Sequence, residues 1–511
     1  MIDPQTPVLI GVGQIVSHWR PGSGEDAPSP QDLRGEAARR ALADSGADPA
    51  ALAAVIDRVV AVRTMLDSVP TLPQPFGRCA NPPGTLANDL GIHPREAIHS
   101  KVGGDQPQAL VNESAAAIYR GEARAVLLAG AEANAAMRAA LKAGAALDWS
   151  RSSEGACTDL GLGSPLLSPY EMVNGLGAPT QTYPAFEHAL AARLGHDRAG
   201  HRAAMSALWA GFSRVAAANP YAQFPVERSA EFLTTPGADN YPVADPYFKW
   251  DVAQDAVNQG AALILTSEGE ADRLGIARER RVYLHGHAAA ADRFTSERPD
   301  LSRSLATELV LAQTLVTSGI TATELGLLDL YSCFPVAVLL AAEALGIDPL
   351  ADPEKLTVTG GLPFFGGAGN NYAMHAIATM VERLRAAPGI RGLVLANGGF
   401  LSKEAAGVYS TEPMAGWLPQ SDADIQAQCD AQVGPPLLSE DADGVLESFT
   451  VTYVKGEAAR GYAFLRTDDG ARVLARVAKG EAGKLAALTR DGVTEQRLTS
   501  RTVDGVIMLV L

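Results

Sequence analysis

The two halves of the chain repeat one order of structural elements, and this repetition constrains the fold more than any other feature. The apolar run from Ala123 to Gly130, ARAVLLAG, matches IRGLVLANGG from Ile390 to Gly399, and the opening run from Pro7 to Gln14 resembles that from Arg281 to Gly286. Short apolar runs of this kind are typical of buried strands. Four elements recur in one order at an offset of about 270 residues, which predicts an internal duplication of about 130 residues per copy.

Helical patterns alternate with these strands in both halves. Residues 32–45 space their apolar side chains at helical intervals, as do residues 304–318, which are followed by Gly319. Alternating strands and helices predict an α/β fold with mostly parallel sheets and right-handed crossovers. A chain of 511 residues is too long for a single core, so we expect several domains.

Each half also has a glycine-rich loop that leads into an apolar-periodic helix. These loops lie in Val102 to Gln108, VGGDQPQ, and in the stretch from Gly360 to Leu384, which opens GGLPFFGGAGNN. Glycine permits positive φ and close approach of a ligand to the backbone, and Asn370 and Asn371 stand where a helix N-cap belongs. Unpaired N–H groups at such a helix start can hold an anion or a developing oxyanion.

Composition excludes several classes of function. Hydrophobic residues make up 47% of the chain and charged residues 20%, as in a globular protein. A net charge of −16 argues against a nucleic-acid partner. The chain has no apolar run of about twenty residues and no basic start followed by an apolar segment, so we expect no membrane association and a cytoplasmic location. The four cysteines have no metal-ligand spacing, so we expect reduced thiols and no metal.

Changes in composition and in the hydrophobic pattern along the sequence predict four parts and a linker. We expect a first α/β half over residues 1–146, a loop or insertion region over 147–250 and a second half over 251–418. After a polar linker over 419–444, residues 445–511 show short alternating runs separated by turn residues, which predict a small all-β, barrel-like domain.

The duplicated halves, the insertion between them and the run NQGAALILTSEGEADRLGI after it resemble the thiolase superfamily. The resemblance covers about Pro7 to Thr411 and implies a five-layered α/β/α/β/α core, with a coenzyme A site built largely by the insertion. The fused β-domain makes the type-1 thiolase-like proteins the nearest group. Fold alone would give such a protein the name acetyl-CoA acetyltransferase, and fold is no evidence of activity.

The reacting side chains of thiolases are absent at the matching positions. The nucleophilic cysteine falls on Gly103 or Gly104, so acyl-enzyme chemistry is excluded there. The Gly-His-Pro motif falls on Gly366 and Gly367 with Ala368, and the Cys-x-Gly motif falls on Ala396-Asn397-Gly398.

One further motif points to a different chemistry. Tyr331-Ser332-Cys333-Phe334 resembles the Tyr-Asp-Cys-Phe motif of thiolase-like aldolases, which shorten steroid side-chain thioesters together with a partner that has an OB-type barrel. The resemblance makes Tyr331 and Tyr372 the acid/base candidates. Tyr331 follows a predicted strand, where α/β enzymes expose active groups, or it is an ordinary buried aromatic residue.

Four more residues carry a functional and a structural interpretation each. Cys333 is a candidate for an activated thiol, or a buried structural cysteine. His375 is a candidate base, or a satisfied helix histidine. Asp105 is a candidate general base, or a helix cap, and Asn397 is a donor to a thioester oxygen, or a support for its glycine-rich turn.

We therefore expect a thiolase-like protein that binds an acyl-CoA between its halves, without a covalently bound cofactor, as a monomer or homodimer in lipid metabolism. Its chemistry would make or break a carbon–carbon bond, for example in retro-aldol cleavage of a 3-hydroxyacyl-CoA. One alternative is a non-catalytic acyl-CoA-binding or scaffold protein. In another, the β-domain binds a ligand or a partner protein of its own. The residues expected to bind the thioester or form an oxyanion hole are Gly103, Gly104, Gly366, Gly367, Asn370, Asn371 and Asn397.

Overall fold

The computed structural model describes residues 2–493 and 496–511. One sheet is formed by β1 (Pro7–Val16), β2 (Ile56–Ala61), β3 (Glu96–His99), β4 (Ala125–Ala133), β5 (Thr158–Asp159) and β8 (Asn258–Ser267). Another is formed by β9 (Val282–Ala291), β10 (Leu325–Leu330), β11 (Arg391–Gly398) and β12 (Lys403–Ser410). The order β1-β8-β4-β2 corresponds strand by strand to β9-β12-β11-β10, while β3 and β5 extend the first sheet beyond β2. The two sheets join where β1 pairs with β9. The strand order confirms the duplication.

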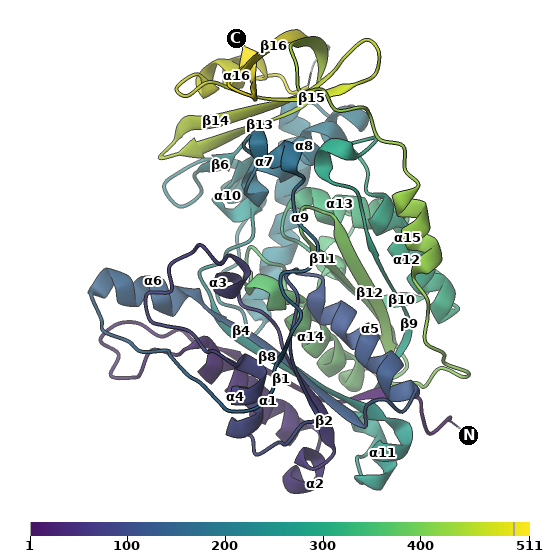
Figure 1. Ribbon diagram of the computed structural model, residues 1–511. Coiled ribbons are helices and arrows are strands. Elements are labelled where there is room, and N and C mark those ends of the chain that lie inside the picture. Colours follow the sequence, from purple (N-terminus) through teal and green to yellow (C-terminus); the bar gives the residue numbers. More distant parts are fainter. Residues whose placement is uncertain (1, 494–495) are drawn as a thin grey trace.

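Helices cover the outer faces of both sheets and fill the space between them (Figure 1). These helices are α1 (Pro30–Asp44), α4 (Pro82–Asp89), α5 (Gln106–Tyr119), α12 (Leu305–Ser318), α13 (Pro335–Ala344) and α14 (Tyr372–Ala386). Helices α1 and α4 pack on the first sheet, α12 and α13 on the second, and α5 and α14 lie between the two. This is the five-layered α/β/α/β/α arrangement that the sequence predicts.

Burial explains why these runs form these elements. Every residue of β4 is buried, as expected for a continuous apolar run with helices on both faces of its sheet. Helix α14 is buried on all sides from Tyr372 to Val381, because it lies in the middle layer. Helix α12 ends at Gly319, whose φ of 66° gives the left-handed cap that glycine adopts most readily.

The sheets are mixed rather than mostly parallel. The pairs β2–β3, β2–β4 and β10–β11 are parallel, whereas β8 is antiparallel to both β1 and β4, and β12 is antiparallel to both β9 and β11. Apolar runs show that a strand is buried but not the direction in which it enters the sheet, so the sequence could not give this.

The insertion builds a helical hairpin of α8 (Pro179–Arg193) and α9 (Arg198–Ala218). Its minor elements are α7 (Pro169–Val173), α10 (Ala230–Thr234), β6 (Pro242–Ala244) and β7 (Tyr247–Phe248), and α6 (Asn134–Ala143) precedes it in the first half. Short helices elsewhere are α2 (Pro49–Ala53), α3 (Met65–Ser68) and α11 (Glu268–Arg273).

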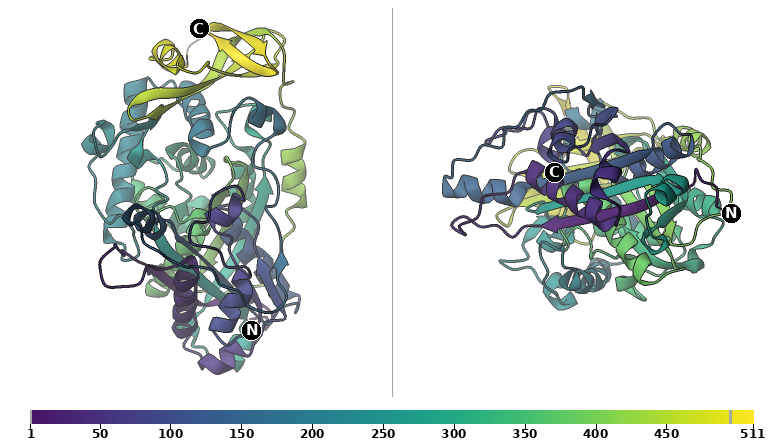
Figure 2. Two further views of the ribbon diagram at one scale, coloured as in Figure 1. Left: turned by 60° about the vertical axis from the view of Figure 1, so that its left-hand side comes forward. Right: turned by 90° about the horizontal axis from the view of Figure 1, so that it is seen from below.

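The C-terminal part forms a closed five-stranded barrel at the end of the molecule opposite the first half (Figure 2). Its strands are β13 (Ala442–Val454), β14 (Glu457–Arg466), β15 (Arg472–Arg476), β16 (Arg497–Val503) and β17 (Val506–Val510). They close in the order β13-β14-β15-β17-β16, and α16 (Ala482–Leu488) lies between β15 and β16 in the chain. Strand β6 of the insertion pairs with β13 at Thr452, so insertion and barrel share a sheet.

The segment 419–444, expected as a polar linker, contains helix α15 (Ala423–Asp430). This helix packs on β9 and α12, and the Gln426 side chain exchanges two hydrogen bonds with the backbone of Ala291, at 2.8 and 3.0 Å. Among the residues that the structure describes, no helix is long and apolar enough to cross a membrane.

Candidate functional site

The loop that opens α5 lies where the two halves of the protein meet. The α-carbon of Gly104 faces Tyr331 and the backbone of Asn397: a Cβ on Gly104 would lie 2.5 Å from the Asn397 carbonyl oxygen and 2.8 Å from Tyr331 Cζ. The Tyr331 hydroxyl would be closer still. The room that a side chain at position 104 would need is therefore taken by the phenol of Tyr331.

Tyr331 directly follows β10, so the end of this strand aims its side chain at the Gly104 loop. Its hydroxyl has no hydrogen-bond partner among the described residues. Burial raises the pKa of Tyr331 well above 10, and the nearby Cys333, Asp105 and Glu404 raise it further because a tyrosinate would meet their negative charge. Tyr331 is therefore a hydrogen-bond donor rather than a base.

Asp105 is a buried acid in the loop that contains Gly104. Asp105 accepts a hydrogen bond from Gln106 Nε2 at 2.9 Å through one oxygen, whereas its Oδ1 has no partner. Burial raises the pKa of Asp105 to about 6. Asp105 stands at the N-cap of α5 but makes no side-chain cap bond, so capping does not explain its position.

Glu404 on β12 is a site residue that the sequence did not indicate. It pairs directly with Asn397 of β11, which places the two side chains on one face of the sheet. Glu404 is only 2% exposed, and neither carboxyl oxygen has a hydrogen-bond partner. Burial raises its pKa well above 4.5, and the charge of Asp105 adds to this effect.

The side chain of Asn397 contacts the insertion. Its Nδ2 donates to Tyr183 Oη at 3.2 Å and lies 3.8 Å from Cys333 Sγ, whereas its Oδ1 is buried without a partner. Tyr183, on α8, stacks on Phe334 with ring centroids 4.1 Å apart and was not indicated by the sequence. Cys333 keeps some exposure, yet desolvation raises the pKa of its thiol to about 12, so it is no thiolate near neutral pH.

Tyr372 and His375 lie on α14 and direct their polar atoms elsewhere. The Tyr372 hydroxyl lies 2.6 Å from Thr359 Oγ1 and donates to Asp329 Oδ1 at 3.2 Å, although its ring packs edge-on against Tyr331. His375 is fully buried, its Nδ1 lies 2.9 Å from Gln14 Oε1, and burial lowers its pKa to about 3. The structure therefore brings only Tyr331 of the two tyrosines to the Gly104 loop.

The second glycine-rich loop forms hydrogen bonds with loops of the first half. Asn370 Oδ1 accepts from Gly103 N at 3.1 Å, and Asn370 Nδ2 donates to Arg63 O at 2.8 Å. Asn371 Nδ2 donates to Gly130 O at 2.9 Å. Gly367 N donates to Gln254 O at 2.8 Å, and a Cβ at Gly366, whose φ is 125°, would meet the Gln259 side chain. These groups hold loops together, whereas the N–H of Gly104 has no partner among the described residues.

The cluster of Gly104, Asp105, Tyr331, Asn397 and Glu404, called the junction cluster below, holds one acid that ionises near neutral pH beside groups that remain protonated. Such a pair of acids with different pKa values suits proton transfer to and from a bound polar ligand. The cluster offers no nucleophile, because residue 104 is glycine and Cys333 is protonated.

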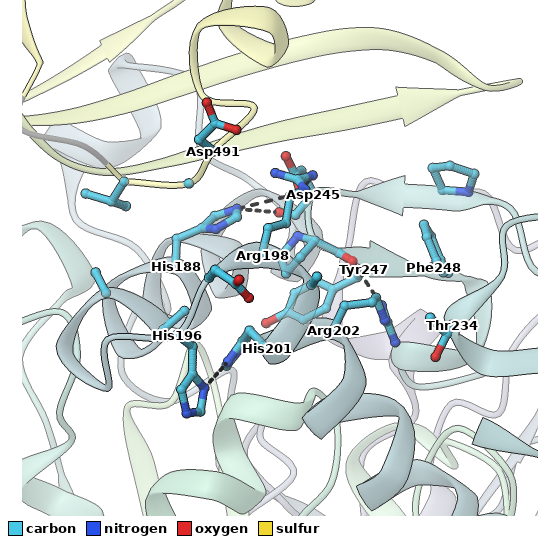
Figure 3. Close-up of a pocket in the computed structure, with 18 of the residues that line it drawn as sticks. His188, His196, Arg198, His201, Arg202, Thr234, Asp245, Tyr247, Phe248 and Asp491 are labelled. Atoms are coloured by element: carbon cyan, nitrogen blue, oxygen red, sulfur yellow. Dashed lines mark hydrogen bonds and ion pairs between the residues drawn. The ribbon is translucent and has the colours of Figure 1, made fainter. Parts of the chain in front are cut away.

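A cavity of about 610 Å³ lies between the helical hairpin of the insertion and the barrel (Figure 3). His188, Arg198 and Asp245 line it on the insertion side, and Tyr453 and Asp491 come from the barrel. His188 lies on α8, the helix that also carries Tyr183 of the site. Helix α8 therefore lines the cavity through His188 and contacts Asn397 of the junction cluster through Tyr183.

A scan against models of protein families gave no match, and a search of curated proteins also gave none. Among solved structures, the Ltp2-ChsH2(DUF35) aldolase is 19% identical, with 80% of this chain and 98% of that chain covered and a TM-score of 0.56. The dimeric peroxisomal thiolase of Saccharomyces cerevisiae is 14% identical over 81% of this chain and 99% of its own, with a TM-score of 0.57. Identities this low show the fold alone.

A monomeric SCP2-thiolase like protein type 1 from Mycobacterium smegmatis is 36% identical to this chain. The match covers 100% of both chains, barrel included, with a TM-score of 0.85. The chain therefore belongs to the family of SCP2-thiolase-like proteins of type 1, within the thiolase superfamily.

Proposed function

We propose that the protein binds an acyl-CoA thioester at the junction cluster and makes or breaks a carbon–carbon bond next to the thioester carbonyl, without an acyl-cysteine. The supporting observation is a set of buried polar atoms without partners: Asp105 Oδ1, Asn397 Oδ1 and both oxygens of Glu404. Unpaired buried polar atoms cost free energy and are rare, so several of them around the ends of β10 and β11 favour a polar ligand. Proteins that share the fold include an acetyl-CoA acetyltransferase and an aldolase.

Retro-aldol cleavage of a 3-hydroxyacyl-CoA is the specific reaction that these groups fit. Asp105, ionised above a pKa of about 6, accepts the proton of the 3-hydroxyl group. The bond between C2 and C3 then breaks, C3 becomes a carbonyl carbon, and the electron pair forms the enolate of the shortened thioester. A proton returned to C2 gives the shorter acyl-CoA.

The protonated groups stabilise the enolate. Glu404 keeps its proton near neutral pH because its pKa is raised, so it donates a hydrogen bond to the thioester oxygen as negative charge develops there. The N–H of Gly104, which has no partner among the described residues, is a second donor in this proposal. Tyr331 donates rather than accepts, which moves the role of base from tyrosine to Asp105.

We assign the coenzyme A portion to the cavity between the insertion and the barrel. Its volume of about 610 Å³ lies within the range of about 300–1,000 Å³ typical of ligand sites. The barrel strand order β13-β14-β15-β17-β16, with a helix between the third and fourth strands, favours an OB-type barrel. Its residues Tyr453 and Asp491 line the cavity, so the barrel forms part of the ligand site.

The test combines calorimetric titration with product analysis. Wild type is titrated with CoA and acetyl-CoA, then incubated with straight-chain and steroidal 3-hydroxyacyl-CoA thioesters, and the shortened acyl-CoA is quantified by mass spectrometry. We expect Asp105→Asn to lower turnover at least about a hundredfold, as for loss of a general base, and Glu404→Gln to lower it strongly.

Glu132→Gln is the matched control, because Glu132 is also a fully buried acid with a raised pKa, about 8, but lies outside the junction cluster. It should retain wild-type turnover. Binding without any cleavage would support a non-catalytic acyl-CoA-binding protein instead, and absence of binding by every thioester would reject the acyl-CoA site.

A further inference from the structure

Helix α1 buries an arginine that has no counter-ion. Arg34 is 2% exposed, and neither a hydrogen bond nor an ion pair joins its side chain to any residue that the structure describes. Its Nε is fully enclosed without a partner. A guanidinium group stays protonated in proteins, so this is a buried positive charge. Buried charges are normally paired, because an unpaired one costs several kcal/mol.

The acids near Arg34 do not neutralise it. Glu132 accepts a hydrogen bond from Met65 N at 2.7 Å and is protonated at neutral pH, because burial raises its pKa to about 8. Asp67 is bonded by Thr64 Oγ1 at 2.9 Å and by Gln74 Nε2 at 3.2 Å, and no ion pair joins it to Arg34 among the described residues.

Arg34 faces empty space instead. It lines a small cavity of about 30 Å³, which adjoins a cavity of about 450 Å³. The two cavities share Asp67, Arg78, Cys79 and Pro82 in their walls. Together they offer room for a small ligand with one charged group placed at Arg34.

The larger cavity has a position where α/β proteins bind ligands. Arg63 lies two residues after β2, and His99 ends β3, so the cavity lies at the carboxyl ends of these parallel strands. Crevices outside the carboxyl ends of the strands are the usual ligand sites of open α/β sheets.

Other lining groups add donors. Arg78 is bonded only by the neutral Gln74, at 3.3 Å, and so adds an unneutralised charge. His99 Nε2 is buried without a partner, and burial together with Arg63 lowers the pKa of His99 to about 4. Arg63 is already paired with Asp159.

We propose that the adjoining cavities at the carboxyl ends of β2 and β3 bind a phosphate group, whose charge pairs with Arg34 while Arg78 and His99 donate further hydrogen bonds. The space beyond one phosphate fits the organic part of a small phosphate ester. This site is separate from the junction cluster and does not rest on the function proposed there.

Thermal unfolding with three probes tests the site: inorganic phosphate, glycerol 3-phosphate and CoA, each against chloride at matched ionic strength. Wild type should gain a few degrees in midpoint with inorganic phosphate or glycerol 3-phosphate. Arg34→Met should lose that gain, with the dissociation constant raised about tenfold or more. Without phosphate, Arg34→Met should be at least as stable as wild type, because an unpaired buried charge is removed.

Arg39→Met is the matched control: Arg39 lies on the same helix but is exposed and paired with Glu36. It should keep the full response. A gain with inorganic phosphate identifies a free anion as ligand, and a gain with glycerol 3-phosphate alone identifies an ester. If Arg34→Met does not fold, Arg78→Gln, an exposed substitution, should still reduce the gain. An equal gain in Arg34→Met, a gain from CoA alone that persists in this variant, or no gain with any probe would overturn the proposal.

Discussion

Position 104 has room for no side chain larger than a hydrogen atom. A nucleophilic residue placed there would therefore lower the free energy of unfolding. Gly104→Cys would push the Tyr331 ring and the Asn397 backbone apart, as in overpacked cores, so we expect a loss of about 1–3 kcal/mol in the free energy of unfolding. We also expect no acyl-enzyme with acetyl-CoA. Urea denaturation and intact-protein mass spectrometry measure the two effects. Gly237→Ala, where a Cβ meets nothing within 4 Å, should be nearly neutral.

Asp105 should make stability depend on pH in a defined window. Its pKa of about 6 in the folded protein exceeds the ordinary 3.8, so the folded state holds a proton that the unfolded state releases. The free energy of unfolding should therefore fall by about 3 kcal/mol as pH rises from about 4 to above 6. Asp105→Asn should lack this contribution and show a correspondingly shallower fall. Denaturation across this range checks it, with exposed Asp424→Asn as the control; parallel profiles for wild type and Asp105→Asn would contradict it.

The glycine-rich loops and the motif around Tyr331 pointed to the candidate site, because motif residues that match or are missing can be recognised in a single sequence. The remaining members could not be found in that way. Glu404 is a lone glutamate in a run of small residues, and such a residue is typical of a surface until β12 is seen to bury it. Tyr183 lies in the insertion, far from every motif, and only the packing of α8 on Phe334 brings it to Asn397.

At the scale of elements, strands with continuous apolar runs were predictable and weakly patterned ones were not. Strand β12, KEAAGVYS, and barrel strand β16, RLTSRTV, lack the apolar run or clear alternation that marks a strand. Both segments form strands because they pair with a strand on each side. Strand β12 lies between β11 and β9, and β16 lies between β13 and β17. Tertiary pairing outweighs local preference at such positions.

Hydrogen bonds from the Arg472 side chain link the barrel to the second half. Arg472 on β15 is fully buried, donates to Glu447 Oε2 at 2.8 Å, and also donates to the backbone oxygens of Ser296 at 2.8 Å and Arg298 at 2.6 Å. Arg472→Met should cost about 3–5 kcal/mol, because the half-buried Glu447 and the backbone oxygens of Ser296 and Arg298 lose a fully buried donor. Arg466→Met also removes a partner of Glu447 but from a half-exposed position, so it should cost about 1 kcal/mol or less. Urea denaturation compares the two, and equal losses would contradict the assignment.

At the scale of the molecule, the barrel and the insertion share one hydrophobic cluster. Tyr183 and Phe186 of α8 pack with Tyr462, Phe464 and Leu474 of the barrel. We therefore expect one cooperative unfolding transition. Tryptophan fluorescence reports only on the rest of the chain, since residues 442–511 contain no tryptophan, whereas far-ultraviolet circular dichroism reports on both parts. Coincident transitions would agree with a shared core; an early transition seen by circular dichroism alone would show that the barrel unfolds by itself.

The two-residue strand β5 has a consequence for self-association. A strand at the border of a sheet exposes unpaired backbone groups that can add a strand from another molecule. Here Thr158 and Asp159 already occupy the outer side of β3 at Ile98 and His99, and Asp159 is held by Arg63. A second copy could not pair with β3 at these two residues without first displacing β5, so this very short strand hinders growth of the sheet from β3 into a neighbouring molecule.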